Sequence, residues 1–239
     1  SPETSAVFWP GNTALSQLNI GVVGNLGTGK TQLVQSLVYQ LRKESEKVQS
    51  TPMTALILDY KHDYQKDEFL MSVGGKVLKP HKIPLDIFRV SGEDTNPNRY
   101  KRARAFVDVI KKIYQGVGPV QVDNLIQVIM DAYAANNGSP TIAEIAAGYR
   151  AKVPNGDSVV ATLNIFVMQE IFSSDKTELK TLAELIDGSV LVLDLRELDP
   201  DTATKNALVA LFLNQYLEYM IQLQKWPFEK KGDTTLRRI

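Results

Sequence analysis

Residues 24–31 constrain the fold of this 239-residue chain more than any other segment. They read Gly-Asn-Leu-Gly-Thr-Gly-Lys-Thr, which fits the pattern G-x-x-x-x-G-K-[ST] of a phosphate-binding loop. An apolar run at 20–23 precedes the loop, and apolar residues recur at helical spacing between Leu33 and Leu41. The motif requires a strand, a loop and a helix in this order, so we expect a buried strand at 20–23 and a helix from Gly29 to about Lys47.

The residue types of this loop indicate what it binds. Gly24 and Gly29 let the backbone turn without a Cβ clash, so successive N–H groups can face one anion. Lys30 is expected to reach the β- and γ-phosphates of a nucleotide, and the Thr31 hydroxyl to ligate Mg²⁺. A glycine-rich turn before an ordinary helix would explain neither residue. We therefore predict a site for ATP and Mg²⁺ made by the whole loop: Gly24, Asn25, Leu26, Gly27, Thr28, Gly29, Lys30 and Thr31.

Composition limits the remaining function classes. The 27 basic and 27 acidic residues leave no overall positive charge, so a nucleic-acid binder would need a local patch or a ring of several subunits. The chain has no cysteine, which excludes thiol catalysis, and its two histidines argue against a His-based zinc site. We find neither a membrane-spanning run nor a signal peptide, and we expect a cytoplasmic protein. The start at Ser-Pro-Glu suggests a piece of a longer chain.

A second strand is predicted at residues 55–60, which read Ala-Leu-Ile-Leu-Asp-Tyr. Strand, helix and strand over about 40 residues make a βαβ unit, so this strand should be fully buried and parallel to the first. Ligands of open α/β sheets bind at the carboxyl ends of the strands, which places Asp59 at the same edge as the phosphate-binding loop. We predict that Asp59 is catalytic, in contact with the Mg²⁺ shell or the attacking water; the alternative is a strand-end residue that caps a loop.

The rest of the chain alternates between strand and helix patterns. We predict short strands at 77–78 and 87–88, helices at 98–115, 121–135, 141–150 and 157–173, a strand at 189–195 and a well-buried helix at 201–225. The fold class is therefore α/β: a P-loop NTPase of the RecA/ASCE-like kind, with a parallel sheet flanked by helices and an all-helical insertion. The predicted segments are 1–97 for the first part of the core, 98–182 for the insertion and 183–239 for the rest of a truncated core.

A basic cluster lies in the first predicted helix of the insertion. It is interpreted as a solvated helix face, with a DNA- or partner-facing role as the alternative. Its members are Arg99, Lys101, Arg102, Arg104, Lys111 and Lys112.

A P-loop NTPase also needs a carboxylate at the end of a second buried strand and a group that positions water. No apolar run in this chain is followed by Asp-Glu. Asp194 ends the apolar run at 190–193 and is one candidate for the Mg²⁺-side carboxylate. The alternative, which we favour, places the acidic strand beyond Ile239, so that this piece binds nucleotide but hydrolyses it poorly. The chain also lacks an Asn-Lys-x-Asp guanine signature.

The order of these pieces resembles the HerA/FtsK group of DNA-translocating ATPases. The likeness is carried by Gly24–Thr31, Leu56–Tyr64, Pro84–Phe88 and Val190–Leu195, with a helical insertion before the last of them. Within the group, the chain is similar to the HerA-type ATPases of DNA phosphorothioation-dependent restriction systems, known as DptH or DndH. In HerA-type proteins an Asp-Glu strand follows the long helix.

The resemblance implies an ATP-hydrolysing motor in a bacterial defence system. It implies double-stranded DNA and other subunits of a restriction complex as partners, a hexameric ring with ATP sites between subunits, and an arginine supplied by a neighbour. The candidates for that arginine are Arg150, Arg196, Arg237 and Arg238.

Two other functions stay open. A non-hydrolysing nucleotide-binding scaffold would explain the lack of Asp-Glu. A small-molecule P-loop kinase would need an arginine-rich lid, whereas the arginine-rich segment at 99–104 has a helical pattern.

Overall fold

The computed structural model describes residues 19–49, 52–136, 138–222, 229–231 and 234–236. Its centre is a parallel three-stranded sheet with the order β1-β3-β2. These strands are β1 (Ala55–Asp59), β2 (Gly75–Leu78) and β3 (Val190–Asp194). The middle strand, β3, pairs along both edges, and all five of its residues are buried.

Helices account for most of the remaining described chain. They are α1 (Lys30–Gln49), α2 (Asp67–Val73), α3 (Asn96–Ile113), α4 (Pro119–Asn136), α5 (Ile142–Lys152), α6 (Ser158–Met168), α7 (Leu182–Ile186), the 3₁₀ turn η1 (Arg196–Leu198) and α8 (Thr202–Gln222). A separate antiparallel pair joins β4 (Glu229–Lys231) to β5 (Thr234–Leu236).

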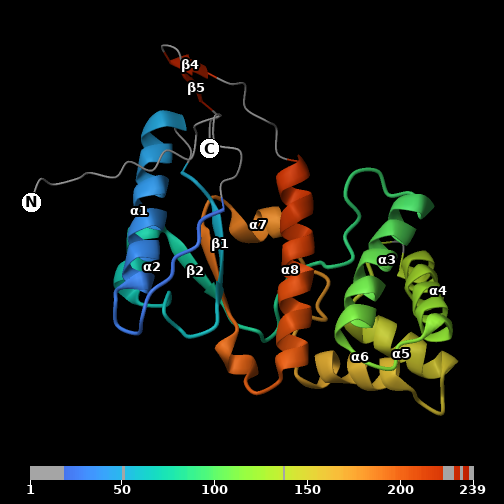
Figure 1. The fold of residues 1–239 in the computed structure, drawn as a ribbon. Helices are drawn as coiled ribbons and strands as arrows, with labels where there is room; N and C mark the ends of the chain where they lie inside the picture. The colour runs from blue at the N-terminus through green and yellow to red at the C-terminus, as the bar shows by residue number, and fades with distance from the viewer. Residues whose placement is uncertain (1–18, 50–51, 137, 223–228, 232–233, 237–239) are drawn as a thin grey trace, which may run out of the picture.

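The sheet separates two apolar layers because side chains alternate along a strand. Val190 and Val192 of β3 pack with α1 and α2 on one face, and Leu191 and Leu193 pack with α7 and α8 on the other. Figure 1 shows this arrangement, with α3 to α6 lying beyond α8. The parallel sheet flanked by helices and the all-helical segment are therefore as the sequence predicts.

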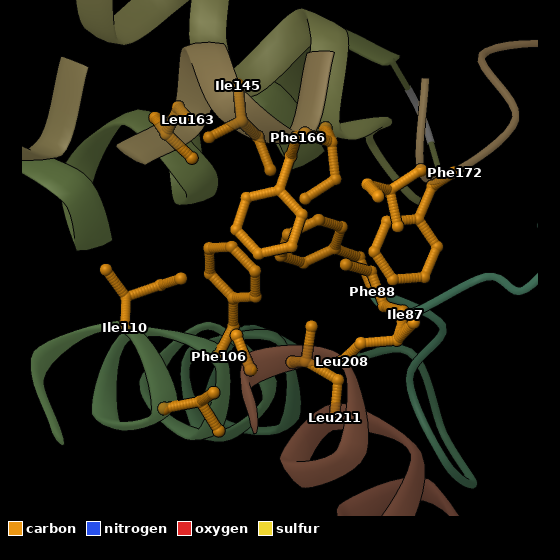
Figure 2. Packing of buried hydrophobic residues seen from close by; sticks show 14 of the residues in the cluster. Ile87, Phe88, Phe106, Ile110, Ile145, Leu163, Phe166, Phe172, Leu208 and Leu211 are labelled. Carbon is orange, nitrogen blue, oxygen red and sulfur yellow. The ribbon is translucent and has the colours of Figure 1, made fainter. Parts of the chain in front are cut away.

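The helical segment shares its core with the sheet layer. Phe106 of α3, Phe166 of α6 and Leu208 of α8 form one buried cluster with Phe88 and Phe172 (Figure 2). The ring centres of Phe88 and Phe106 lie 5.0 Å apart. The helices α3 to α6 are thus fixed to the sheet layer by continuous apolar packing, while the segment boundaries at 98 and 182 stay a prediction.

The strand predicted at 20–23 does not form. Residues 19–24 have no strand structure, and the exposed fractions of Ile20 and Val23 are 54% and 92%. An apolar run becomes a strand only where its backbone groups find a partner. The sheet has the order β1-β3-β2, and this segment pairs with none of its strands, so the outer edge of β1 has no partner strand among the described residues. For the same reason β1 is an edge strand of intermediate burial rather than the fully buried strand expected.

Two smaller predictions also need correction, and two short helices are present that the sequence did not predict. Residues 87–88 form a turn, not a strand, because the carboxylate of Asp86 accepts the Phe88 N–H at 3.2 Å. The helix predicted at 157–173 ends at Met168, and Glu170 then takes a left-handed conformation that turns Ile171 into the core. The short helices α2 and α7 were not predicted, because each is too brief to show a helical period.

The helix predicted at 201–225 is buried only in its first half. Leu208, Leu211 and Phe212 of α8 are buried, whereas Leu217 and Ile221 are 59% and 72% exposed. Figure 1 shows that this second half extends past α7. The apolar residues around the helix predict burial on all sides, but the neighbouring elements cover only its first turns.

This difference can be tested by a matched pair on one helix. We predict that Leu208→Ala lowers the free energy of unfolding by about 2 to 5 kcal/mol, because it leaves a cavity in the shared core. Leu217→Ala should change it by about 0.5 kcal/mol or less. Chemical denaturation followed by circular dichroism measures both, and equal losses would contradict the uneven burial of α8.

Candidate functional site at the carboxyl edge of the sheet

The loop at 24–31 has the backbone that a phosphate-binding loop requires. Gly27 and Gly29 have φ angles of 79° and 82°, a left-handed conformation that strains any residue with a Cβ. A Cβ on Gly24 would lie 2.7 Å from the Thr28 hydroxyl, which itself donates to the Asn25 carbonyl at 2.8 Å. The loop then runs directly into α1. These glycines are therefore required by the shape of the loop.

Lys30 folds back over this loop. Its Nζ donates to the carbonyl oxygens of Gly24 at 2.8 Å and Asn25 at 2.6 Å. An ammonium group has three donors, so this placement leaves donor capacity and a full positive charge beside the loop. The cation lies where it can attract an oxyanion bound by the loop.

Thr31 connects the loop to the segment after β1. Its Oγ1 donates to Asp63 Oδ2 at 3.4 Å, and Gln35, one turn further along α1, donates to the Asp63 carbonyl at 2.7 Å. The prediction that the end of the 55–60 strand shares an edge with the phosphate-binding loop is thereby confirmed. A hydroxyl and a carboxylate are also the oxygen ligands that Mg²⁺ prefers.

Asp59 has the geometry of a loop cap. It is 1% exposed, and its carboxylate accepts the backbone N–H groups of Lys61, Asp63 and Tyr64, each at 3.1 Å. Burial raises the pKa of the Tyr64 hydroxyl above its usual value, with a further contribution from Asp63 and Asp59. These bonds match the alternative interpretation of Asp59, because its oxygens are committed to the backbone of residues 61–64. Its catalytic role stays a prediction.

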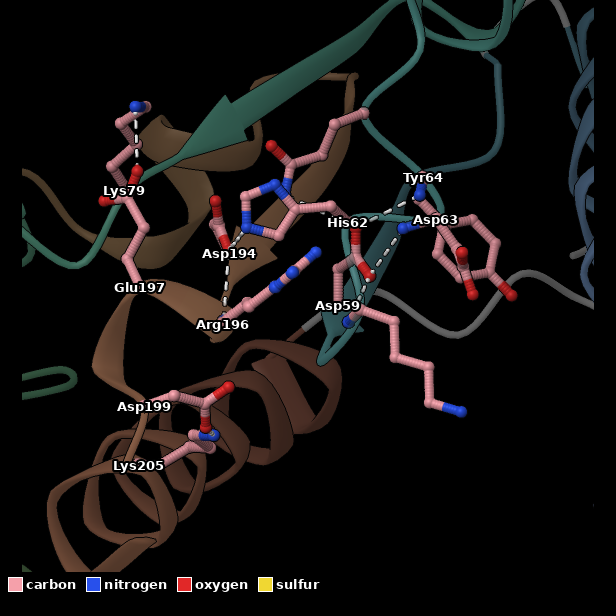
Figure 3. Close-up of polar contacts among 12 residues, drawn as sticks. Asp59, His62, Asp63, Tyr64, Lys79, Asp194, Arg196, Glu197, Asp199 and Lys205 are labelled. Atoms are coloured by element: carbon pink, nitrogen blue, oxygen red, sulfur yellow. Dashed lines mark hydrogen bonds and ion pairs between the residues drawn. The ribbon is translucent and has the colours of Figure 1, made fainter. Parts of the chain in front are cut away.

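A second buried carboxylate lies beside Asp59. Asp194 is its partner in the β1–β3 register and is fully buried. Asp194 Oδ1 lies 3.0 Å from Nε2 of His62 and accepts the Arg196 N–H at 3.1 Å (Figure 3). Its other oxygen, Oδ2, has no hydrogen-bond partner among the described residues. Sequence reasoning identified Asp194 but missed His62, whose one signal was its position shortly after a strand-end carboxylate.

An open cleft of about 520 Å³ runs along this edge, between the start of α1 and α2. Thr31, Gln35, His62 and Asp63 are among the residues that line it. Within the described ranges, no three His, Asp or Glu side chains gather in a way that could hold a metal on their own. A cation here would therefore depend on a ligand as well as on protein oxygens.

The three arginines of the basic cluster in α3 are occupied by ion pairs. Arg99 pairs with Asp94, Arg102 is buried against Glu218, and Arg104 pairs with Asp108. These contacts match the interpretation as an ordinary helix surface better than a DNA-facing patch. Among the arginine candidates, Arg196 extends from η1 toward the carboxyl ends of β1 and β3, and Arg150 is exposed on α5 (Figure 3). Arg237 and Arg238 lie outside the described residues.

Comparison with solved structures matches VirB4 of Thermoanaerobacter pseudethanolicus, with a TM-score of 0.53 and 16% sequence identity. The match covers 82% of this chain and 55% of that chain, so the present sequence spans about half the length of its structural neighbour. No family model and no curated protein matches the sequence. The likeness shows a P-loop NTPase fold, which confirms the predicted fold class.

No helix in the part of the chain that the structure describes is long and apolar enough to cross a membrane.

The loop-capping role of Asp59 gives a testable prediction. Asp59→Ala leaves three backbone donors without their acceptor and should lower the free energy of unfolding by about 3 kcal/mol. Hydrogen exchange at the amides of Lys61, Asp63 and Tyr64 should also become faster. Asp67→Ala is the control, since Asp67 is exposed at the start of α2 nearby. Unchanged exchange at these amides in Asp59→Ala would contradict the assignment.

Proposed function

We propose that this chain is the ATP- and Mg²⁺-binding motor domain of a DNA-translocating P-loop ATPase. The observation that carries the proposal is the loop at 24–31, where left-handed Gly27 and Gly29, the close approach at Gly24 and the position of Lys30 occur together at the start of α1. The P-loop NTPase fold is consistent with this assignment.

The residues of the loop fit a nucleotide. A Cβ would fill the space at Gly24, the amides at the start of α1 can donate to a phosphate, and Lys30 has a charge to offer. Bound Mg²⁺·ATP supplies a γ-phosphoryl group that can be transferred to water. Lys30 and the loop amides would stabilise negative charge on that group, and the Thr31 hydroxyl would bind the cation. Asp63 would orient Thr31 through the contact between their oxygens.

The wider assignment comes from the resemblance to HerA-type ATPases. We propose double-stranded DNA and other subunits of a phosphorothioation-dependent restriction complex as partners, a hexameric ring as the assembly, and the cytoplasm as the location. The equal numbers of acidic and basic residues favour a ring, where several weakly charged subunits together surround DNA. Arg196 is the described candidate nearest to the site for an arginine that acts across subunits.

Replacement of the loop lysine tests the proposal. We expect Lys30→Ala to lower ATP turnover by at least about 100-fold, because it removes a charge that stabilises the transferred phosphoryl group. Lys47→Ala is the matched control, because Lys47 lies on the same helix and pairs with Glu44 at the surface. Release of inorganic phosphate measures turnover, and circular dichroism checks the fold. Equal turnover in Lys30→Ala and the parent protein would contradict the assignment.

The same assay separates the motor from its rivals. Stimulation of turnover by double-stranded DNA would support the translocase. Tight ATP binding with no turnover in the full-length protein would favour the scaffold, and phosphate transfer to a small acceptor without DNA stimulation would favour the kinase.

A further inference from the structure

Burial of the Asp194 carboxylate is energetically unfavourable. Its carboxylate has no exposed surface, and Oδ2 lacks a hydrogen-bond partner within the described residues. A buried oxygen without a hydrogen-bond partner destabilises the folded state. The carboxylate therefore contributes little to the stability of the fold at this position. Its two described contacts, to the His62 side chain and the Arg196 backbone, indicate which groups it holds in place.

His62 is held in an unusual way. Its φ angle is 61°, a left-handed conformation that is uncommon for a residue with a Cβ. The side chain is 37% exposed, with Nε2 at 3.0 Å from the buried Asp194 oxygen. Because an ionised carboxylate only accepts hydrogen bonds, Nε2 carries the proton in this contact. The opposite nitrogen, Nδ1, is then the one available to a ligand in the cleft.

The position of this ring connects it to the phosphate-binding loop. His62 lines the same cleft as Thr31 and Asp63, and Asp63, the next residue along the chain, contacts the Thr31 hydroxyl. His62 therefore lies on the strand-end side of the cleft, and Thr31, which follows Lys30 directly, lies on the helix side.

We propose that His62, through its unprotonated Nδ1, accepts a hydrogen bond from the water next to the terminal phosphate of a nucleoside triphosphate, and that Asp194 is the positioning residue that holds His62 there. This inference rests on the proposed function, because it assigns residues to the same nucleotide site. The sequence shows no Asp-Glu pair, and His62 would supply a polar group on the side of the site where such a pair would lie. His62 offers Nδ1 to the ligand, and Asp194 fixes the tautomer and the direction of the ring.

Nuclear magnetic resonance of the imidazole groups tests the contact without relying on turnover. The chain has two histidines, so His62→Gln and His81→Gln variants assign both signals. His81 is the internal control because its side chain is 57% exposed and lies near Glu170. We expect Mg²⁺ with a non-hydrolysable ATP analogue to shift the His62 ¹⁵N signals, while Mg²⁺ with AMP shifts them little. The His81 signals should not respond to either nucleotide.

Substitution at Asp194 tests the positioning role. In Asp194→Ala the ¹⁵N response of His62 to Mg²⁺ with the ATP analogue should shrink toward that of His81, because the ring is no longer held in place. Turnover should fall about 10- to 100-fold in His62→Gln and in Asp194→Ala, and the double variant should be no worse than the weaker single variant, because both changes remove one function. Thermal unfolding checks that each variant folds, and His81→Gln should keep normal turnover.

The outcomes separate this inference from the proposed function. Nucleotide binding is measured independently by calorimetry. If the ATP analogue binds and the His62 signals stay unchanged, the inference is overturned while the nucleotide site stands. If no nucleotide binds, both are overturned. Additive losses in the double variant would show that Asp194 does not act through His62.

Discussion

The in-register pairing of β1 with β3 is the constraint on which the site depends. It places Asp59 and Asp194 side by side at the ends of neighbouring parallel strands, on the face that α1 and α2 cover. Two carboxylates taken out of water at this spacing need donors. The chain supplies them from the segment that follows β1: its backbone folds around Asp59, and its His62 side chain bonds Asp194. The sheet therefore determines the shape of the loop at 60–65.

That loop in turn completes the candidate site. By wrapping around Asp59 it turns Asp63 toward the start of α1, where Thr31 and Gln35 bind it. Asp63 is thus the carboxylate neighbour of the phosphate-binding loop, although it lies about 30 residues away along the chain. It reaches this position because the segment after β1 folds its backbone donors around the buried end of the strand. Lys30 lies on the α1 side of the candidate site, and Asp63 approaches Thr31 from the segment after β1.

The sequence was informative where one local rule decides the outcome. The glycines at 24, 27 and 29, the capping box that starts α5 at Thr141 and the apolar run of β3 all follow from nearby residues. It was misleading where distant partners decide. The run at 20–23 has strand composition but no pairing partner among the described residues, and α8 has apolar residues on sides that no element covers. His62 could not be predicted, because its role arises from a strand that lies more than 100 residues further along the chain.

The complete enclosure of β3 has a consequence for how the molecule opens. A strand paired on both edges and covered on both faces exchanges its amide hydrogens only when the whole fold opens, whereas an exposed loop exchanges through small local openings. Asp194 ends the first kind of segment, and Lys30 follows the second kind. These two elements of the candidate site therefore differ in mechanical character: the strand that ends at Asp194 is a fixed reference, and the loop before Lys30 is the part that can adapt to what it binds.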